Sequence, residues 1–155
     1  MVKVLEEKHM VRKITENDRV EYLNMTKDFY NSDAVLHSID ENNCIKTFDE
    51  LMRSDEYALC FILEYEDDIA GYALLAKTFS QEAGGMVCWI EELYIKPEYR
   101  NLGIGSEFFS YFDSNVSIGL KRIRLEVEED NLRAIELYKR QGYKNLCYKQ
   151  MYKEL

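Results

Sequence analysis

The sequence predicts an α/β domain in which a mixed, mostly antiparallel twisted sheet is flanked by helices. Two apolar runs, 58–64 and 69–79, are separated by the acidic turn Glu66-Asp67-Asp68, which is typical of an antiparallel hairpin. The second half of the chain then alternates helical and strand periodicity. With 155 residues, 46% of them hydrophobic, and no Ser/Gly/Pro-rich linker, the chain is expected to form one domain over residues 1–155.

The first half of the chain predicts two helices between strands. Alternating residues indicate a strand from His9 to Thr15, and Asp18 is a suitable N-cap for a helix that extends to about Tyr30. Thr47 and Glu50 have capping-box spacing ahead of Leu51, which predicts that a second, shorter helix begins there. After the hairpin, the β-branched and aromatic residues of 86–95 predict another strand.

The second half adds helix, strand, helix and strand. Helical spacing of apolar residues predicts a helix from Gly103 to about Asn115, and 122–127 alternates as a strand with Glu126 on its polar side. Asn131 is a suitable N-cap for a helix that ends at Gly142, and a last strand is expected from about 143 to 152. The predicted order βααβββαβαβ places helices over a sheet.

Charge and composition exclude several functions. A net charge of −9 argues against nucleic acid as a partner and is compatible with a cationic substrate. Residues 1–13 lack the apolar run of a signal peptide or a membrane span, so we expect a soluble, cytoplasmic protein that does not bind membranes. The four cysteines are dispersed without a CxxC pair, which predicts no metal site and no disulfide.

The segment 93–105, LYIKPEYRNLGIG, has the chemistry of an anion site. Glycines at a helix start allow backbone N–H groups to approach a ligand, the helix N-terminus is partly positive, and Arg100 adds a guanidinium. These groups would suit a pyrophosphate, although a bare GxG is also compatible with a turn that needs glycine only for its geometry. The dinucleotide pattern GxGxxG fails because its third position is Phe108, and neither a P-loop nor a GxSxG motif occurs.

The same segment fits LxIxPxxRxxGxG and resembles the pyrophosphate-binding segment of the GNAT superfamily of acetyltransferases. Downstream, 131–143 (NLRAIELYKRQGY) resembles the second motif of that superfamily, NxxAxxxYxxxG followed by an aromatic residue. The resemblance extends to the element order and implies acetyl-CoA as co-substrate. The residues that it implies for acetyl-CoA binding are Leu93, Tyr94, Ile95, Arg100, Asn101, Leu102, Gly103, Ile104, Gly105, Ser106, Asn131, Ala134, Tyr138 and Lys139. Asn101 stands where the family often has glycine, and asparagine tolerates a left-handed backbone.

The implied reaction is acetyl transfer to a primary amine by direct attack in a ternary complex. A base must deprotonate the amine, and Glu91 and Glu92 lie in a hydrophobic strand that leads into the loop. Strand alternation places them on opposite faces, and resemblance to the spermidine/spermine-like members favours Glu91. By the same resemblance Tyr138 protonates the leaving thiolate. The alternatives are solvated or salt-bridged glutamates and a core tyrosine.

Other functions and partners stay open at this point. A catalytically silent module that senses acetyl-CoA would keep the loop but not the chemistry, and an unrelated nucleotide-binding domain would recognise adenine nucleotides. The acceptor is a small-molecule amine or a protein or peptide amine, and a homodimer is compatible with the sequence. Residues 29–33 with His37 are a candidate wall of the acceptor pocket.

Overall fold

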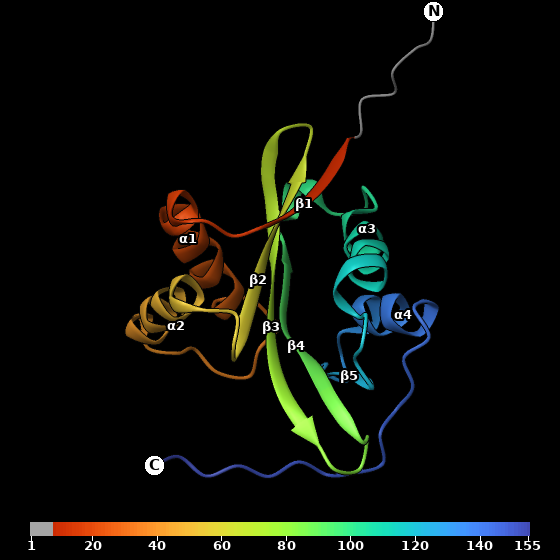
Figure 1. The fold of residues 1–155 in the computed structure, drawn as a ribbon. Coiled ribbons are helices and arrows are strands. Elements are labelled where there is room, and N and C mark those ends of the chain that lie inside the picture. Colours follow the sequence, from red (N-terminus) through yellow and green to blue (C-terminus); the bar gives the residue numbers. More distant parts are fainter. Residues whose placement is uncertain (1–7) are drawn as a thin grey trace, which may run out of the picture.

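The computed structural model describes residues 8–155 and contains a five-stranded sheet flanked by four α-helices (Figure 1). The strands are β1 (His9–Lys13), β2 (Ala58–Tyr65), β3 (Asp68–Ser80), β4 (Gly85–Ile95) and β5 (Arg122–Leu125), and the helices are α1 (Arg19–Tyr30), α2 (Glu41–Arg53), α3 (Ile104–Tyr111) and α4 (Leu132–Arg140). Strands β1 to β4 pair antiparallel in chain order, and β5 is parallel to β4. The predicted mixed, mostly antiparallel sheet with flanking helices is therefore confirmed.

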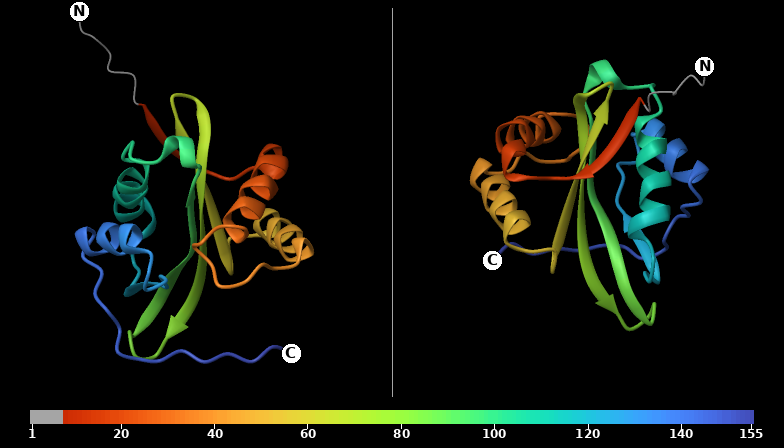
Figure 2. Two further views of the ribbon diagram at one scale, coloured as in Figure 1. Left: turned by 180° about the vertical axis from the view of Figure 1, so that it is seen from behind. Right: turned by 45° about the horizontal axis from the view of Figure 1, so that its top comes forward.

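Each face of the sheet has its own core. Helices α1 and α2 cover one face, and α3 and α4 cover the other (Figure 2). Alternation along β3 supplies both cores, because Tyr72 and Leu74 point to the α1 and α2 side while Ala73 and Leu75 point to α3. Each fully buried aromatic side chain, such as Phe108 on α3, contributes about 1.5–3 kcal/mol by leaving water.

The hairpin and the first helix form where the sequence predicts them. Glu66 and Asp67 adopt left-handed backbone, with φ of 49° and 69°, as the tight turn between β2 and β3 requires. Asp18 precedes α1 as expected, but its side chain forms no capping hydrogen bond to this helix, and its carboxylate instead accepts hydrogen bonds from the Thr15 backbone and from Arg12. The acidic turn and the entry to α1 are therefore local consequences of these residues.

The predicted start of α2 is wrong. The helix begins at Glu41, after Asp40, whose side chain accepts a hydrogen bond from the Asn42 backbone. Thr47 lies in the interior of the helix, where its hydroxyl donates to the Asn43 carbonyl. Thr–x–x–Glu spacing predicts a helix start only when no earlier cap exists, since threonine also bonds the preceding turn within a helix.

The predicted last strand is also wrong. Residues 141–155, all within the described part of the chain, form no strand, and Tyr148, Met151 and Tyr152 are exposed. Apolar residues fall at 146–148 and again at 151–152, so they do not alternate and neither face of a strand would be consistently apolar. The segment instead leaves α4, passes the turn between β3 and β4 and ends on the side of the sheet that carries α1 and α2 (Figures 1 and 2).

The centre of β4 contains a register shift. Leu74 of β3 is opposite Glu92, and Leu75 is opposite Ile90, so Glu91 has no partner in β3. Such a bulge bends the strand and changes the side to which its residues point. On the other edge of β4, β5 pairs only with Val87 to Ile90. The two parallel strands therefore separate at Glu91, at the middle of the sheet.

The expectations about the N-terminus are only partly covered by the structure. Residues 1–7, which we expected to carry no signal peptide, lie outside the described residues. Within 8–155, no helix is both long and apolar enough to span a bilayer.

Candidate active site

The glycine loop and the start of α3 form one wall of a large cleft. The cleft has a volume of about 1580 Å³ and is lined by the end of β4, the start of α3, one side of α4 and the segment after α1. Asn101 adopts left-handed backbone with φ of 66°, as asparagine at this position was expected to allow. Gly103 has φ of 81° and is the N-cap residue of α3, so the first N–H groups of this helix have no acceptor within the helix and open toward the cleft.

The Arg100 side chain is held next to this loop by a hydrogen bond to the backbone at the end of β4. Its Nε donates a hydrogen bond of 3.0 Å to the Ile95 carbonyl, and the rest of the guanidinium is exposed on the cleft wall. Gly105 packs against α4, because a Cβ built there would lie 3.1 Å from the Leu137 side chain. The loop therefore combines a positive helix end, a fixed guanidinium and a close approach of two helices.

The second motif forms α4, which lies beside α3 and also lines the cleft. The Asn131 side chain accepts a hydrogen bond of 3.3 Å from the Ala134 backbone and caps this helix, and Gly142 follows its end with φ of 88°. The Tyr138 ring packs edge-on against Phe109, and its phenol lines the cleft without a hydrogen bond to any residue within 8–155. Burial raises the pKa of Tyr138, so its phenol holds its proton at neutral pH.

The structure brings together most of the residues that the resemblance implied. The cleft is lined by Leu93, Tyr94, Ile95, Arg100, Asn101, Gly103, Ile104, Gly105, Ser106, Asn131, Ala134 and Tyr138. Leu102 and Lys139 are exposed and do not line it, although the Leu102 carbonyl contacts His9 Nε2 at 2.9 Å. Residues 29 and 31–33, predicted as a pocket wall, also line the cleft, whereas His37 does not.

Separation of the two parallel strands leaves part of β4 without a neighbour. Beyond Ile90, no strand within residues 8–155 pairs with the edge of β4 that faces β5. Leu93 lies on this stretch, while the carbonyl of Ile95 is already engaged by Arg100. An extended ligand with amide groups can therefore add to this edge as a short extra strand.

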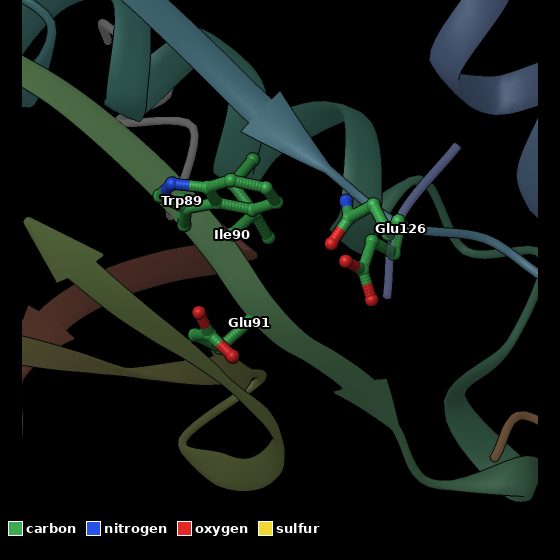
Figure 3. A pocket seen from close by; sticks show the side chains of 5 residues that line it. Trp89, Ile90, Glu91 and Glu126 are labelled. Atoms are coloured by element: carbon green, nitrogen blue, oxygen red, sulfur yellow. The ribbon is translucent and has the colours of Figure 1, made fainter. Parts of the chain in front are cut away.

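Glu91 opens into a smaller cavity of about 270 Å³ at the point where the strands separate. This cavity is also lined by Trp89, Glu126 and, from the C-terminal segment, Gln150 (Figure 3). Partial desolvation raises the pKa of Glu91, and the carboxylates of Glu126 and Glu92 raise it further. The residue is exposed overall, so solvent screens its charge.

Glu92, the next residue, has a different environment. It is 8% exposed, and each carboxylate oxygen accepts a phenol hydrogen bond, from Tyr30 at 2.5 Å and from Tyr72 at 2.6 Å. Burial raises the pKa of Glu92, and the two phenols partly offset that rise. Glu92 is thus buried and, within the described residues, forms no ion pair.

Sequence reasoning missed several residues at this site. Glu126 and Gln150 line the Glu91 cavity, and Tyr30 and Tyr72 bind Glu92. The outward position of Glu126 on its predicted strand was a usable signal. No sequence signal pointed to the two tyrosines or to Gln150, because their positions depend on packing between segments distant in sequence.

The cysteines and acidic residues form no candidate metal centre. Cys44, Cys60 and Cys88 are buried and Cys147 is exposed, and all four are free thiols. Among residues 8–155, no group of three or more histidine, cysteine, aspartate or glutamate side chains is arranged to hold a metal ion. Burial raises the pKa of Cys88 to about 11, so this thiol is protonated at neutral pH.

Comparison with known proteins agrees with this geometry. Residues 21–143, which include the cleft walls, match the family described as Acetyltransferase (GNAT). The chain belongs to the GNAT family. Among curated GNAT relatives, it is 35% identical to thialysine N-epsilon-acetyltransferase of Bos taurus over 50% of this chain and 46% of that protein. It is 28% identical to spermine/spermidine N(1)-acetyltransferase of Bacillus subtilis (strain 168) over 52% and 56% of the two chains. These matches span about half the length of the relatives.

Solved structures confirm the fold of this GNAT chain at low sequence identity. A possible acetyltransferase from Clostridium difficile 630 superposes with a TM-score of 0.80 at 19% identity, covering 96% of this chain and 99% of that chain. AAC(6')-Iy, in complex with a bisubstrate analogue of CoA and acetylneamine, superposes with a TM-score of 0.78 at 11% identity, covering 96% and 99%. At these identities the likeness extends to the fold.

The Glu92 environment predicts a specific dependence of stability on pH. The pKa of Glu92 lies above its ordinary value of 4.5, so the folded protein binds this proton more tightly than the unfolded chain. Its contribution is therefore fully present below about pH 4.5 and is lost as pH rises through the folded pKa. Urea titrations from pH 3 to 8 should show this decline in wild type and a flatter profile in Glu92→Gln.

Asp18→Asn is the control of opposite sign for this measurement. The Arg12 hydrogen bond holds the pKa of Asp18 below its ordinary value of 3.8, so its contribution is present above that value and is lost as pH falls through the folded pKa. Parallel pH profiles for wild type and Glu92→Gln would contradict the burial of an ionisable carboxylate at this position.

Proposed function

We propose that this GNAT chain transfers the acetyl group of acetyl-CoA to a small primary amine by direct attack in a ternary complex. The observation that carries the proposal is the convergence of the α3 N-terminus, the free edge of β4 and the Tyr138 phenol on one cleft. These features supply an anion site, a surface for an amide-containing arm and a proton donor. A silent sensor would need only the first two.

The residues on the cleft walls fit acetyl-CoA. The N–H groups at the start of α3, with Arg100, would hold the pyrophosphate, and the free edge of β4 at Leu93 would bind the pantetheine amides. Asn131 and Ala134 on α4 complete the wall. Bound in this way, acetyl-CoA supplies the activated acetyl thioester.

Glu91 is the proposed general base. Only a neutral amine has the lone pair that attack requires, and a carboxylate of raised pKa at the strand separation can accept the proton. Glu92 has both oxygens occupied by phenols, so it is not positioned to contact an amine. Tyr138 would donate its proton to the leaving thiolate, for which its protonated, unpartnered phenol is suited.

The acceptor that we propose is a cationic small amine. Glu91 and Glu126 face the same 270 Å³ cavity, and the chain carries a net charge of −9, which attracts cations. The names of the curated relatives, which refer to thialysine and to spermine or spermidine, agree with this class. A screen that follows free thiol release from acetyl-CoA with these three amines, and with a peptide amine for comparison, tests the proposal.

A substitution at Gly103 tests where acetyl-CoA binds. Gly103→Ala should lose at least half of the rise in Tm that acetyl-CoA produces, because a side chain at the start of α3 hinders backbone approach to the pyrophosphate. The measurement is thermal unfolding with and without acetyl-CoA.

Gly119→Ala is the matched control for backbone strain. Gly119 has φ of 84°, and a Cβ at either glycine meets no atom within 4 Å, so both variants should lose about 1–2 kcal/mol of stability. Equal ligand-induced shifts in the two variants would remove this loop from the binding site.

Tyr138→Phe should lower kcat by about ten- to a thousandfold and leave acetyl-CoA affinity nearly unchanged, as expected when a general acid is lost. Steady-state kinetics with the acceptor from the screen measure this. Tyr143→Phe is the control, because the buried Tyr143 phenol has no partner within residues 8–155 and packs on the same ring cluster. If Tyr138→Phe retained the wild-type rate, Tyr138 would be a packing residue only.

Glu91→Gln should be slow at neutral pH and recover as pH approaches the pKa of the amine, because solvent then supplies the neutral acceptor. Glu126→Gln should instead keep the base and move the acidic limb of the kcat/KM profile to lower pH, since Glu126 raises the pKa of Glu91. A wild-type pH profile in Glu91→Gln would assign the base elsewhere.

A further inference from the structure

The carboxylate of Glu92 joins two layers of the structure. Tyr30, the last residue of α1, donates to one oxygen, and Tyr72 in the middle of β3 donates to the other. Bonds to both oxygens fix the carboxylate in one orientation, since a rotation would break at least one of them. Glu92 therefore connects α1 to β4, directly after the bulge at Glu91.

The electrostatic surroundings of Glu92 are unusual for a carboxylate in a core. Within residues 8–155 it forms no ion pair, and the titratable groups around it are the phenols of Tyr22, Tyr30 and Tyr72, the thiols of Cys44 and Cys60 and the carboxylate of Glu91. Burial of a carboxylate without a cation is costly, and an apolar side chain of the same volume would fill this space without that cost. What the carboxylate adds is a pair of directional hydrogen bonds.

The segment that follows Tyr30 is anchored to the last turn of α1. Ser32 donates from its backbone and from its hydroxyl to the Phe29 carbonyl, and the Ala34 backbone donates to the Ser32 hydroxyl. Residues 31–36 line the large cleft on the side opposite the coenzyme loop. The last turn of α1 therefore anchors the start of this wall, and Ala34 and Val35 pack against the core beside it.

We propose that Glu92 is a positioning residue for acceptor binding. It holds the wall formed by residues 31–36 at a fixed place relative to Glu91. The hydrogen bond from Tyr30 fixes the end of α1, and edge-on packing of Phe29 on Tyr94 supports the same contact. The hydrogen bond from Tyr72 holds the carboxylate from β3 and involves no residue of the wall. This role rests on the proposed amine acetylation. In it, Glu92 does not touch the acceptor and acts through Tyr30 and the wall.

The test compares two variants that each remove one phenol from the same carboxylate. Tyr30→Phe should raise the KM for the acceptor about tenfold or more, the loss expected for a charge-assisted hydrogen bond, with the acetyl-CoA-induced Tm shift retained. Tyr72→Phe should change this KM less than about threefold, although it loses a bond of the same type. The probes are thialysine, spermine and spermidine. A merely structural role would lower Tm and raise KM in parallel in both variants.

Hydrogen exchange keeps the inference testable without turnover. Tyr30→Phe should accelerate amide exchange in residues 31–36, and Tyr72→Phe should leave it close to wild type. Equal exchange in the two variants, or unchanged exchange in Tyr30→Phe, overturns the positioning role. If the wild-type chain acetylates no amine but exchange follows the expected pattern, the proposed acceptor chemistry fails while the Glu92 connection stands.

Discussion

The register shift at Glu91 is the constraint on which the site depends. It ends regular pairing in the middle of β4, at the same residue where β5 ceases to follow that strand. A cleft can then open at the centre of the sheet while the pairs on either side remain hydrogen-bonded. The loop at 100–105 follows β4 along the chain, α4 follows β5, and both line the large cleft.

The bulge also separates the chemistry of two adjacent carboxylates. Glu91 faces a cavity with a second carboxylate, Glu126, and keeps contact with solvent. Glu92 is enclosed by α1 and β3, and two phenols satisfy its oxygens. The two adjacent glutamates therefore have different environments, because burial and hydrogen bonding change from one residue to the next.

Predictions from local sequence succeeded where the signal was itself local. The acidic turn at 66–67, the left-handed Asn101 and the Asn131 cap involve only neighbouring residues. The false helix start at Thr47 failed because a capping pattern does not state whether an earlier cap exists, and Asp40 provides one. The last strand failed because apolar composition alone does not define a strand face, and residues 143–152 do not alternate.

The sequence by itself determined the sheet with its flanking helices, the turn with Asn101 and Gly103 at the start of α3 and the place of Tyr138 on α4, because each is encoded by periodicity or by a contiguous motif. Only the tertiary structure decided the environments of Glu91 and Glu92, the contacts from Tyr30 and Tyr72, and the presence of Gln150 beside the cavity. The physical reason is that pKa, burial and hydrogen bonding depend on groups brought together across the fold, and strand periodicity gives no sign of a single-residue bulge.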